Sequence, residues 1–417
     1  MSVLITRTTI ADKNSGHNGK TKNVLIEHGR ITAITDETPK ADKIIEGEGS
    51  FLSTGWFDMR SNFRDPGLEY KEDLQSGRLA AQAGGFTDVL LMPETDPVIA
   101  TKNEIRYLVA TNHDNLVQIH PASAVTLGLK GDSFTDMVDL HHAGAKAFTE
   151  GETPIHNSDI LLKTLQYLQP INGLLINRPE DYYLSLFGLM HEGHQSTLMG
   201  TKGIPSLAET LMVQRDLNLL RYAGGKIHFA KISAKGTVEA IREAKAEGLQ
   251  VTCDVAAHQL CFTDEDLAGF DTNLKVSPPF RSEEDRLALI DGLLDGTIDA
   301  IVSSHEPHDI ECKRLEFDLA DPGIIGLQTV FSTAQRGIPQ DVFLEKVTVG
   351  PRSILGIESP KIAEGETACL TLFSPETKWT FDEKTNRSKS ENSPFFGLEL
   401  EGKVLATFNN NQIYIAK

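Results

Sequence analysis

The feature that most constrains the fold is an alternation of apolar strand-like segments with helix-like segments between about residue 53 and residue 355. Two of the helix-like segments carry clear boundaries. The segment 204–225 has Pro205 near its start and Gly224-Gly225 at its end, and the segment 236–248 ends at Gly248. The strand candidates are GWFDM, FTDVLLM, NLVQIH, AKAF, GLLIN, KIHFAKI, LQVTCDV and DAIVSS. Eight strand–helix units in about 300 residues match the size of a (β/α)8 barrel.

The rival architecture is a doubly wound open sheet. Such a sheet usually carries a glycine-rich phosphate turn after its first strand, and FDMRSNFRDPG is not such a turn. Both ends of the chain are rich in β-branched, alternating segments, such as NVLIEHGRITAIT and GKVLATFNNNQIYIA. We therefore predict an α/β protein with a TIM barrel over residues 53–355. Residues 1–52 and 356–417 are predicted to form a composite β-sandwich domain.

Charge and composition exclude several classes of partner. The chain has 40 basic and 59 acidic residues, a formal net charge of −19, which disfavours binding to nucleic acid or to an anionic membrane. No apolar run approaches the roughly 20 residues needed to span a bilayer, and the first residues do not resemble a signal peptide. The four cysteines lie far apart with no CxxC pair. We therefore expect a cytoplasmic protein without disulfides.

In a barrel of this type, functional residues lie at the carboxyl ends of the strands. The polar residues expected there include Arg60, Asn62, Arg64, Glu94, Thr149, Glu150, Arg178, Lys231, Asp254, His258, Ser304, His305 and His308. Several of them are cationic, and cations repel a metal ion. The spacing of HEGH at 191–194 is one residue shorter than the metalloprotease motif, and it contains a glycine. The sequence also has no G-x-S-x-G nucleophile elbow.

Several motifs are specific enough to suggest a family. They are GWFDMRSNFRDPGLEYKEDLQSGRLAAQAGGFTDVLLMPETDPV, HEGHQST, GIPSLAET, KVSPPFRSEEDRLALIDGLLDGTIDAI, SSHEPH and SKSENSPFFG. In order and spacing, over nearly the whole chain, they resemble the dihydroorotases of the amidohydrolase superfamily. The resemblance implies a metal-dependent barrel that interconverts carbamoyl aspartate and dihydroorotate. It also implies a β-sandwich made from both termini, in agreement with the predicted architecture.

The sequence departs from the family pattern at the metal ligands. The family's His-x-His after the first strand is Arg60-Ser61-Asn62 here, and its bridging acid falls at Thr149 or Glu150. The ligand histidines after the fifth and sixth strands become Arg178 and Lys231. Ser304 occupies the position of the family's catalytic aspartate, and serine cannot shuttle a proton near neutral pH without its own base. We therefore predict that zinc, the metal of the resembled family, is absent, and that the chain has no catalytic residue.

The positions that hold substrate in the family are only partly retained. The resemblance implies that Arg64 grips the substrate carboxylate and that His308 assists it. Two family asparagines are replaced, one by Glu94 and one by Ser277. A carboxylate at position 94 would repel an anion.

We derive three hypotheses from these residues. The first is an inactive dihydroorotase homologue of pyrimidine biosynthesis, kept as a homo-oligomeric scaffold or as an assembly partner of aspartate transcarbamoylase, as the resemblance to non-catalytic members implies. The second is an active cyclic amidohydrolase with an altered or metal-free site that uses Lys231, His308 and Ser304. The third is a sensor that binds a small anionic pyrimidine precursor through its basic residues.

A geometric expectation bears on all three hypotheses. Arg60, Arg178 and Lys231 are expected in one barrel mouth, and buried like charges need partners. We predict that at least one of them forms a salt bridge inside the mouth. The expected carboxylate partners are Glu150, Glu94 and Asp58.

Overall fold

The computed structural model describes residues 2–416 of the chain. A parallel sheet runs in the order β6-β7-β8-β9-β10-β13-β14-β15. Its strands are β6 (Trp56–Ser61), β7 (Phe86–Leu91), β8 (Gln118–Ala124), β9 (Ala147–Thr149), β10 (Leu175–Asn177), β13 (Ile227–Phe229), β14 (Val251–Ala256) and β15 (Ala300–Val302). A parallel bridge joins Ser61, at the end of β6, to His305, just after β15. This closure confirms the predicted barrel and excludes the open sheet.

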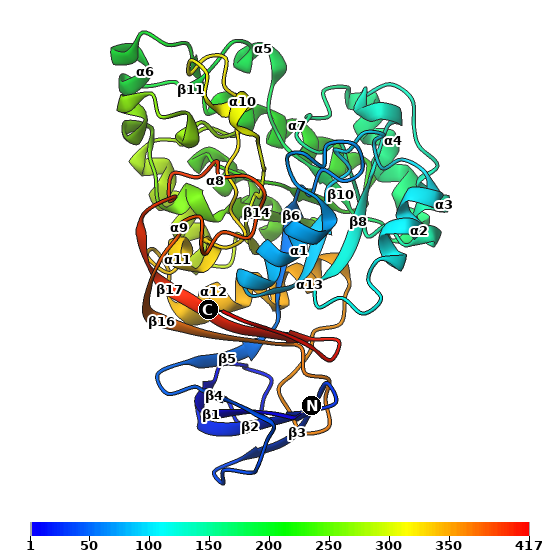
Figure 1. Cartoon of the computed structure of the whole chain (residues 1–417). Helices are drawn as coiled ribbons and strands as arrows, with labels where there is room; N and C mark the ends of the chain where they lie inside the picture. The colour runs from blue at the N-terminus through cyan, green and yellow to red at the C-terminus, as the bar shows by residue number, and fades with distance from the viewer. Residues whose placement is uncertain (1, 417) are drawn as a thin grey trace.

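Helices surround the barrel (Figure 1). Helix α7 begins at Leu207, soon after Pro205, and its C-cap Gly224 has a φ of 71°, which an L side chain rarely adopts. Both boundaries agree with the sequence prediction. The surrounding helices are α1 (Leu74–Ala83), α2 (Lys102–Ala110), α3 (Met137–Ala143), α4 (Ser158–Leu168), α7 (Leu207–Ala223), α8 (Lys235–Ala246), α9 (Glu283–Leu294), α11 (Val330–Ala334), α12 (Gln340–Val347) and α13 (Val349–Leu355).

The barrel has two apolar layers. Trp56 belongs to the large cluster that packs the strands against the helices. Phe57 and Met59, on the same strand, belong to an inner cluster with alanines and aliphatic residues from the other strands. These inner side chains fill the barrel, so it is a packed core and not a pore. The cavity lined by polar residues lies beyond this core, at the carboxyl ends of the strands.

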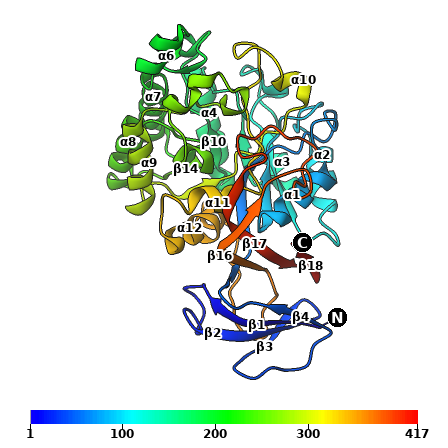
Figure 2. The same ribbon diagram turned by 60° about the vertical axis from the view of Figure 1, so that its left-hand side comes forward.

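The two termini form a β-rich unit beneath the barrel (Figure 2). Its sheet runs β18-β17-β16-β5-β1-β2-β3, with β4 paired to β1. The strands are β1 (Ser2–Ile10), β2 (Thr21–Glu27), β3 (Arg30–Thr35), β4 (Lys43–Glu46), β5 (Phe51–Thr54), β16 (Leu370–Thr380), β17 (Glu399–Asn409) and β18 (Gln412–Ile415). Residues from distant strands, such as Ile31 and Phe408, share one apolar cluster. The sheet therefore folds over on itself, as a sandwich requires.

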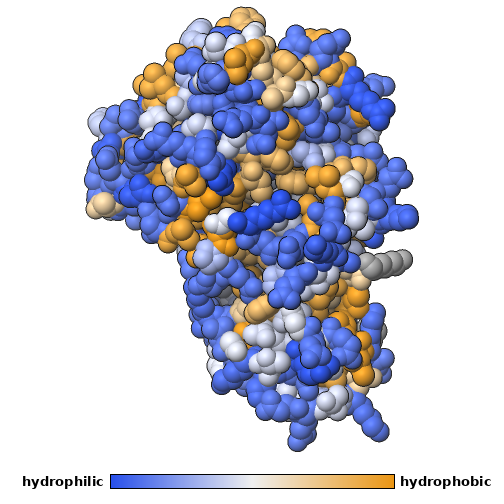
Figure 3. Space-filling view, turned by 90° about the vertical axis from the view of Figure 1, so that its left-hand side faces the viewer, coloured by the Kyte–Doolittle hydropathy of each residue, from blue (hydrophilic) through white to orange (hydrophobic). Residues whose placement is uncertain are grey.

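Short elements decorate the upper end of the barrel. The excursion between β10 and α7 contains α5 (Tyr182–Ser185), β11 (Met190–His191), α6 (His194–Met199) and β12 (Gly203–Ile204), and α10 (Ile310–Lys313) follows β15. Hydrophilic residues cover most of the face in Figure 3, with apolar residues in smaller groups between them. Among residues 2–416, no helix combines the length and apolar character needed to cross a bilayer.

Candidate functional site

The carboxyl ends of the barrel strands open into a cavity of about 460 Å³. Its lining includes eight residues predicted from the sequence: Arg64, Glu94, Arg178, Lys231, His258, Ser277, Ser304 and His308. Arg60 and Asn62, each only 2% exposed, contact the lining residues Glu152 and Glu306. The structure thus brings together, around one cavity, residues that lie up to 248 positions apart in the sequence, as expected for the mouth of a barrel.

One carboxylate, that of Glu152, lies at the centre of the basic residues. Glu152 Oε1 is 2.8 Å from Arg60 Nη2 and 2.5 Å from Lys231 Nζ. Arg178 Nε is 3.6 Å from Glu152 Oε2 and donates a hydrogen bond to the Glu152 main-chain oxygen at 2.7 Å. The prediction that at least one of the three cations forms a salt bridge in the mouth is confirmed, and all three do. We call Glu152, Arg60, Arg178 and Lys231 the central charge cluster.

The predicted carboxylate partners were wrong. Glu150 turns away and accepts hydrogen bonds from Thr126 N and Thr126 Oγ1, both at 2.7 Å. Asp58 accepts hydrogen bonds from Ser61 and Ser303. Glu94 accepts a hydrogen bond from the Glu152 main-chain N–H at 2.9 Å. Glu150 and Asp58 are engaged elsewhere, so Glu150 does not join the other predicted metal positions. Glu94 stays in the mouth: burial alone would lower the pKa of Arg60, but the charges of Glu152 and Glu94 raise it.

Glu152 was missed because it lies beyond the end of β9, outside the residues that directly follow the strand. Between Glu150 and Glu152, Gly151 has a φ of 65° and turns the chain. A Cβ at position 151 would lie 2.4 Å from the Glu94 carboxyl carbon, so glycine also admits the Glu94 side chain. The sequence signal was the pattern Glu150-Gly151-Glu152. Glycine permits a turn there, so the side chain of either glutamate could point into the cavity.

The central charge cluster holds three positive groups and one negative group, and this excess of positive charge shifts the pKa values of Glu152 and Lys231. Burial alone would raise the pKa of Glu152, but the charges of Lys231, Arg60 and Arg178 hold it well below its ordinary value. Burial lowers the pKa of Lys231 from 10.5 to about 8, against the attraction of Glu152, and Arg60 and Arg178 add to the lowering. Lys231 Nζ also donates to the Ser277 main-chain oxygen at 2.7 Å, which helps to hold it in place.

A second set of contacts engages the predicted anion-binding residues. Arg64 forms an ion pair with Glu306 and donates from Nη1 to the Glu94 main-chain oxygen at 3.2 Å. Asn62 Nδ2 also donates to Glu306. Arg64 Nε is buried and has no hydrogen-bond partner among the described residues. An anion in the cavity would therefore compete with Glu306 for the guanidinium of Arg64.

Three residues of the mouth have backbones in the left-handed region. The φ angles are 59° for Arg64, 52° for Lys231 and 48° for Ser304. Non-glycine residues adopt this conformation at a cost of roughly 1–3 kcal/mol, and such residues cluster at functional sites. The backbone of these three residues therefore has a strained conformation of the kind that is common at functional sites.

The donor set at the predicted metal positions does not fit zinc. A zinc site in a protein uses imidazole, thiolate or carboxylate ligands. Arg60, Arg178 and Lys231 offer cationic groups to the cavity and are paired to Glu152. Asn62 and Ser304 offer only neutral oxygen and nitrogen atoms, and Glu150 points elsewhere. The central charge cluster leaves no carboxylate free of a cationic partner to receive an ion.

Comparisons with known proteins agree with this architecture. A family model described as dihydro-orotase-like matches residues 49–237. The chain is 37% identical over 422 residues to a protein named dihydroorotase from Syntrophus aciditrophicus, with 99% of each chain covered. It is 38% identical over 402 residues to a protein of the same name from Geotalea daltonii, covering 94% of this chain and 95% of the relative.

A solved structure shows the same fold at greater distance. It is the L-hydantoinase (dihydropyrimidinase) from Arthrobacter aurescens, with a TM-score of 0.84 at 22% identity, covering 100% of this chain and 96% of that one. A likeness at this identity reports the fold alone. The identity to relatives over nearly the full length shows more: this chain belongs to the dihydroorotase family.

Proposed function

We propose that this member of the dihydroorotase family is a non-catalytic scaffold of pyrimidine biosynthesis that has lost the family's binuclear metal site. The observation that carries the proposal is the central charge cluster. Three buried basic side chains share the Glu152 carboxylate at positions where the family resemblance implies metal ligands. With Glu152 they form an ion cluster in place of a ligand set, and Glu180 also pairs with Arg178 at 3.0 Å.

The electrostatics of the cluster oppose metal binding. A divalent ion about 5 Å from a unit positive charge is repelled by roughly 7 kcal/mol at an effective dielectric constant near 20. Glu152 offsets one of the three cations, and Arg60 and Lys231 are almost fully buried, at 2% and 3% exposed. The cations can leave the cavity only by giving up their ion pairs. An ion would therefore have to displace buried residues before it could bind.

The second candidate is an active cyclic amidohydrolase, which would hydrolyse the C–N bond of a cyclic amide. The names of the relatives described above favour it. The lowered pKa of Lys231, about 8, also favours it, because a group that titrates near neutral pH can transfer protons. Ser304 and His308 line the same cavity. Without a metal, these groups would have to supply the several kcal/mol that Lewis-acid polarisation provides.

Assay of carbamoyl aspartate and dihydroorotate interconversion distinguishes the two candidates. We expect no turnover above the uncatalysed rate, with or without added zinc, cobalt or manganese. The double variant Arg60→His with Asn62→His should also fail, because Arg178 and Lys231 remain paired to Glu152. Turnover by the unmodified protein that is abolished in Lys231→Ala or Ser304→Ala, with the fold intact by circular dichroism, would establish the second candidate instead.

A scaffold role predicts a partner. We propose aspartate transcarbamoylase of the same organism as that partner, with self-association of this chain as part of the assembly in the cytoplasm. Co-expression followed by size-exclusion chromatography should give one complex that contains both proteins and is larger than either alone. If both elute independently at micromolar concentration, the assembly role is excluded. A small anionic pyrimidine precursor is the proposed ligand of the cavity, because Arg64 and His308 line it.

A further inference from the structure

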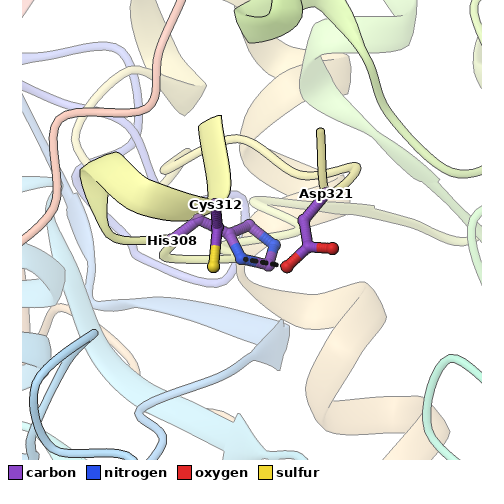
Figure 4. A group of neighbouring side chains, drawn as sticks. All are labelled: His308, Cys312 and Asp321. Carbon is purple, nitrogen blue, oxygen red and sulfur yellow. Dashed lines mark ion pairs between the residues drawn. The ribbon is translucent and has the colours of Figure 1, made fainter. Parts of the chain in front are cut away.

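A second cluster of polar side chains lies at the outer edge of the cavity, apart from the central charge cluster. It consists of His308, Cys312 and Asp321, whose ligand atoms all lie within 4.8 Å of one another. Figure 4 shows the three side chains next to one another, with the Asp321 carboxylate turned toward the His308 ring, and His308 Nδ1 lies 3.5 Å from that carboxylate. His308 and Asp321 also line the cavity, which provides an entry path from solvent. We call these three residues the rim cluster.

The orientation of His308 is that of a metal ligand. Its Nε2–H donates to the Pro322 main-chain oxygen at 3.1 Å, which leaves the Nδ1 lone pair facing the rim cluster. Metal-binding histidines usually donate their second ring N–H to a carbonyl or carboxylate in this way.

A cation already lies among these donors. Lys71 Nζ is 3.2 Å from His308 Nδ1 and 3.8 Å from Asp321 Oδ2. The rim cluster therefore attracts positive charge, and the ammonium group occupies the place that an ion would take. Lys71 has a long side chain that borders the cavity, so its head can withdraw without a change in the backbone.

We propose that His308 Nδ1, Cys312 Sγ and the Asp321 carboxylate form a binding site for one zinc-class divalent ion, with Lys71 as its internal competitor. Thiolate, imidazole and carboxylate are together typical of such an ion, and a water would complete a tetrahedral set. Tetrahedral ligands at 2.0–2.3 Å from the ion are about 3.3–3.8 Å apart, so the cluster must contract by about 1 Å.

Binding of the ion releases one proton and displaces one ammonium group. The Cys312 thiol releases its proton to solvent as the Sγ–metal bond forms, and the Lys71 ammonium moves into the cavity. One thiolate and one carboxylate then neutralise the divalent ion. The site does not depend on the proposed loss of catalysis, because it shares no residue with the central charge cluster. It would fasten the segment after β15, which His308 N–H already joins to Asn392 Oδ1 at 3.1 Å.

Cobalt titration tests the site through a spectrum that does not depend on activity. A thiolate bound to Co²⁺ gives a charge-transfer absorption in the near ultraviolet, and the central charge cluster has no thiol that could give one. We expect this band in the unmodified full-length protein. In Lys71→Met it should appear at a cobalt concentration at least about tenfold lower, because a competing unit charge about 4 Å away is removed.

Two cysteine variants provide the control. Cys312→Ser should lose the band. Cys261→Ser should keep it, because the Cys261 thiol is also half-buried but donates to the Thr333 main-chain oxygen at 3.4 Å, outside the rim cluster. The proposal is overturned if the unmodified protein shows no band at millimolar cobalt, or if the band persists in Cys312→Ser.

Discussion

Replacement of Glu152 by glutamine is expected to lower the free energy of unfolding by about 3–5 kcal/mol, the usual effect of removing one partner from a buried ion pair. The variant keeps the shape of the side chain but leaves Arg60, Arg178 and Lys231 without their shared negative charge. Chemical denaturation at pH 7 measures the change. This is the largest effect on stability that the central charge cluster predicts for a single substitution.

A neighbouring carboxylate provides the matched control. Glu180 pairs with Arg178 alone, at 3.0 Å, and its side chain is 15% exposed. Glu180→Gln should cost less than Glu152→Gln, because it removes one partner of Arg178 alone, and Arg178 keeps its contacts with Glu152. Equal losses of unfolding free energy in the two variants would show that the charge of Glu152 stabilises the mouth no more than that of Glu180.

The second large effect is a dependence of stability on pH between about 8 and 10.5. In this window the unfolded chain binds a proton on Lys231 that the folded chain does not, because the pKa of Lys231 falls from 10.5 to about 8 on folding. The free energy of unfolding therefore rises with pH across this window, and the gain is lost as the pH falls back through about 8. The two pKa values differ by about 2.5, which corresponds to roughly 3 kcal/mol.

A pair of variants isolates this contribution. Lys231→Met should lose the rise in stability that the unmodified protein shows between about pH 8 and 10.5. Lys313, outside the central charge cluster, also has its pKa lowered to about 8 by burial and the charge of Lys275. Lys313→Met should therefore keep the part of the rise that is due to Lys231. If the unfolding free energy of Lys231→Met depends on pH as it does in the unmodified protein, folding does not lower the pKa of Lys231.

The barrel could be predicted because its signals are local and repeated. Helix α7 is marked by Pro205 and Gly224, and the strands are short apolar runs, so periodicity and boundary residues sufficed. The excursion with β11 and β12 was not predicted, because its strands are only two residues long. Strands of that length carry no periodicity.

The site was predictable only in part. Strand order predicts that Arg60, Arg178 and Lys231 meet, because the carboxyl ends of parallel strands share one edge. Which glutamate they contact depends on the turn at Gly151, and that is decided by packing against Glu94. The rim cluster was equally hidden from the sequence. Cys312 and Asp321 are brought together by an irregular segment, for which sequence spacing gives no distance.

Anomalous X-ray scattering at the zinc edge, from crystals grown with zinc, tests the central claim most directly. The account predicts no zinc peak at the Glu152 carboxylate, with Arg60, Arg178 and Lys231 still paired to it. A peak confined to His308, Cys312 and Asp321 would agree with this claim and would support the rim site. A peak about 2.0–2.2 Å from a Glu152 carboxylate oxygen, with the basic side chains turned away, would contradict the claim that they have replaced the metal.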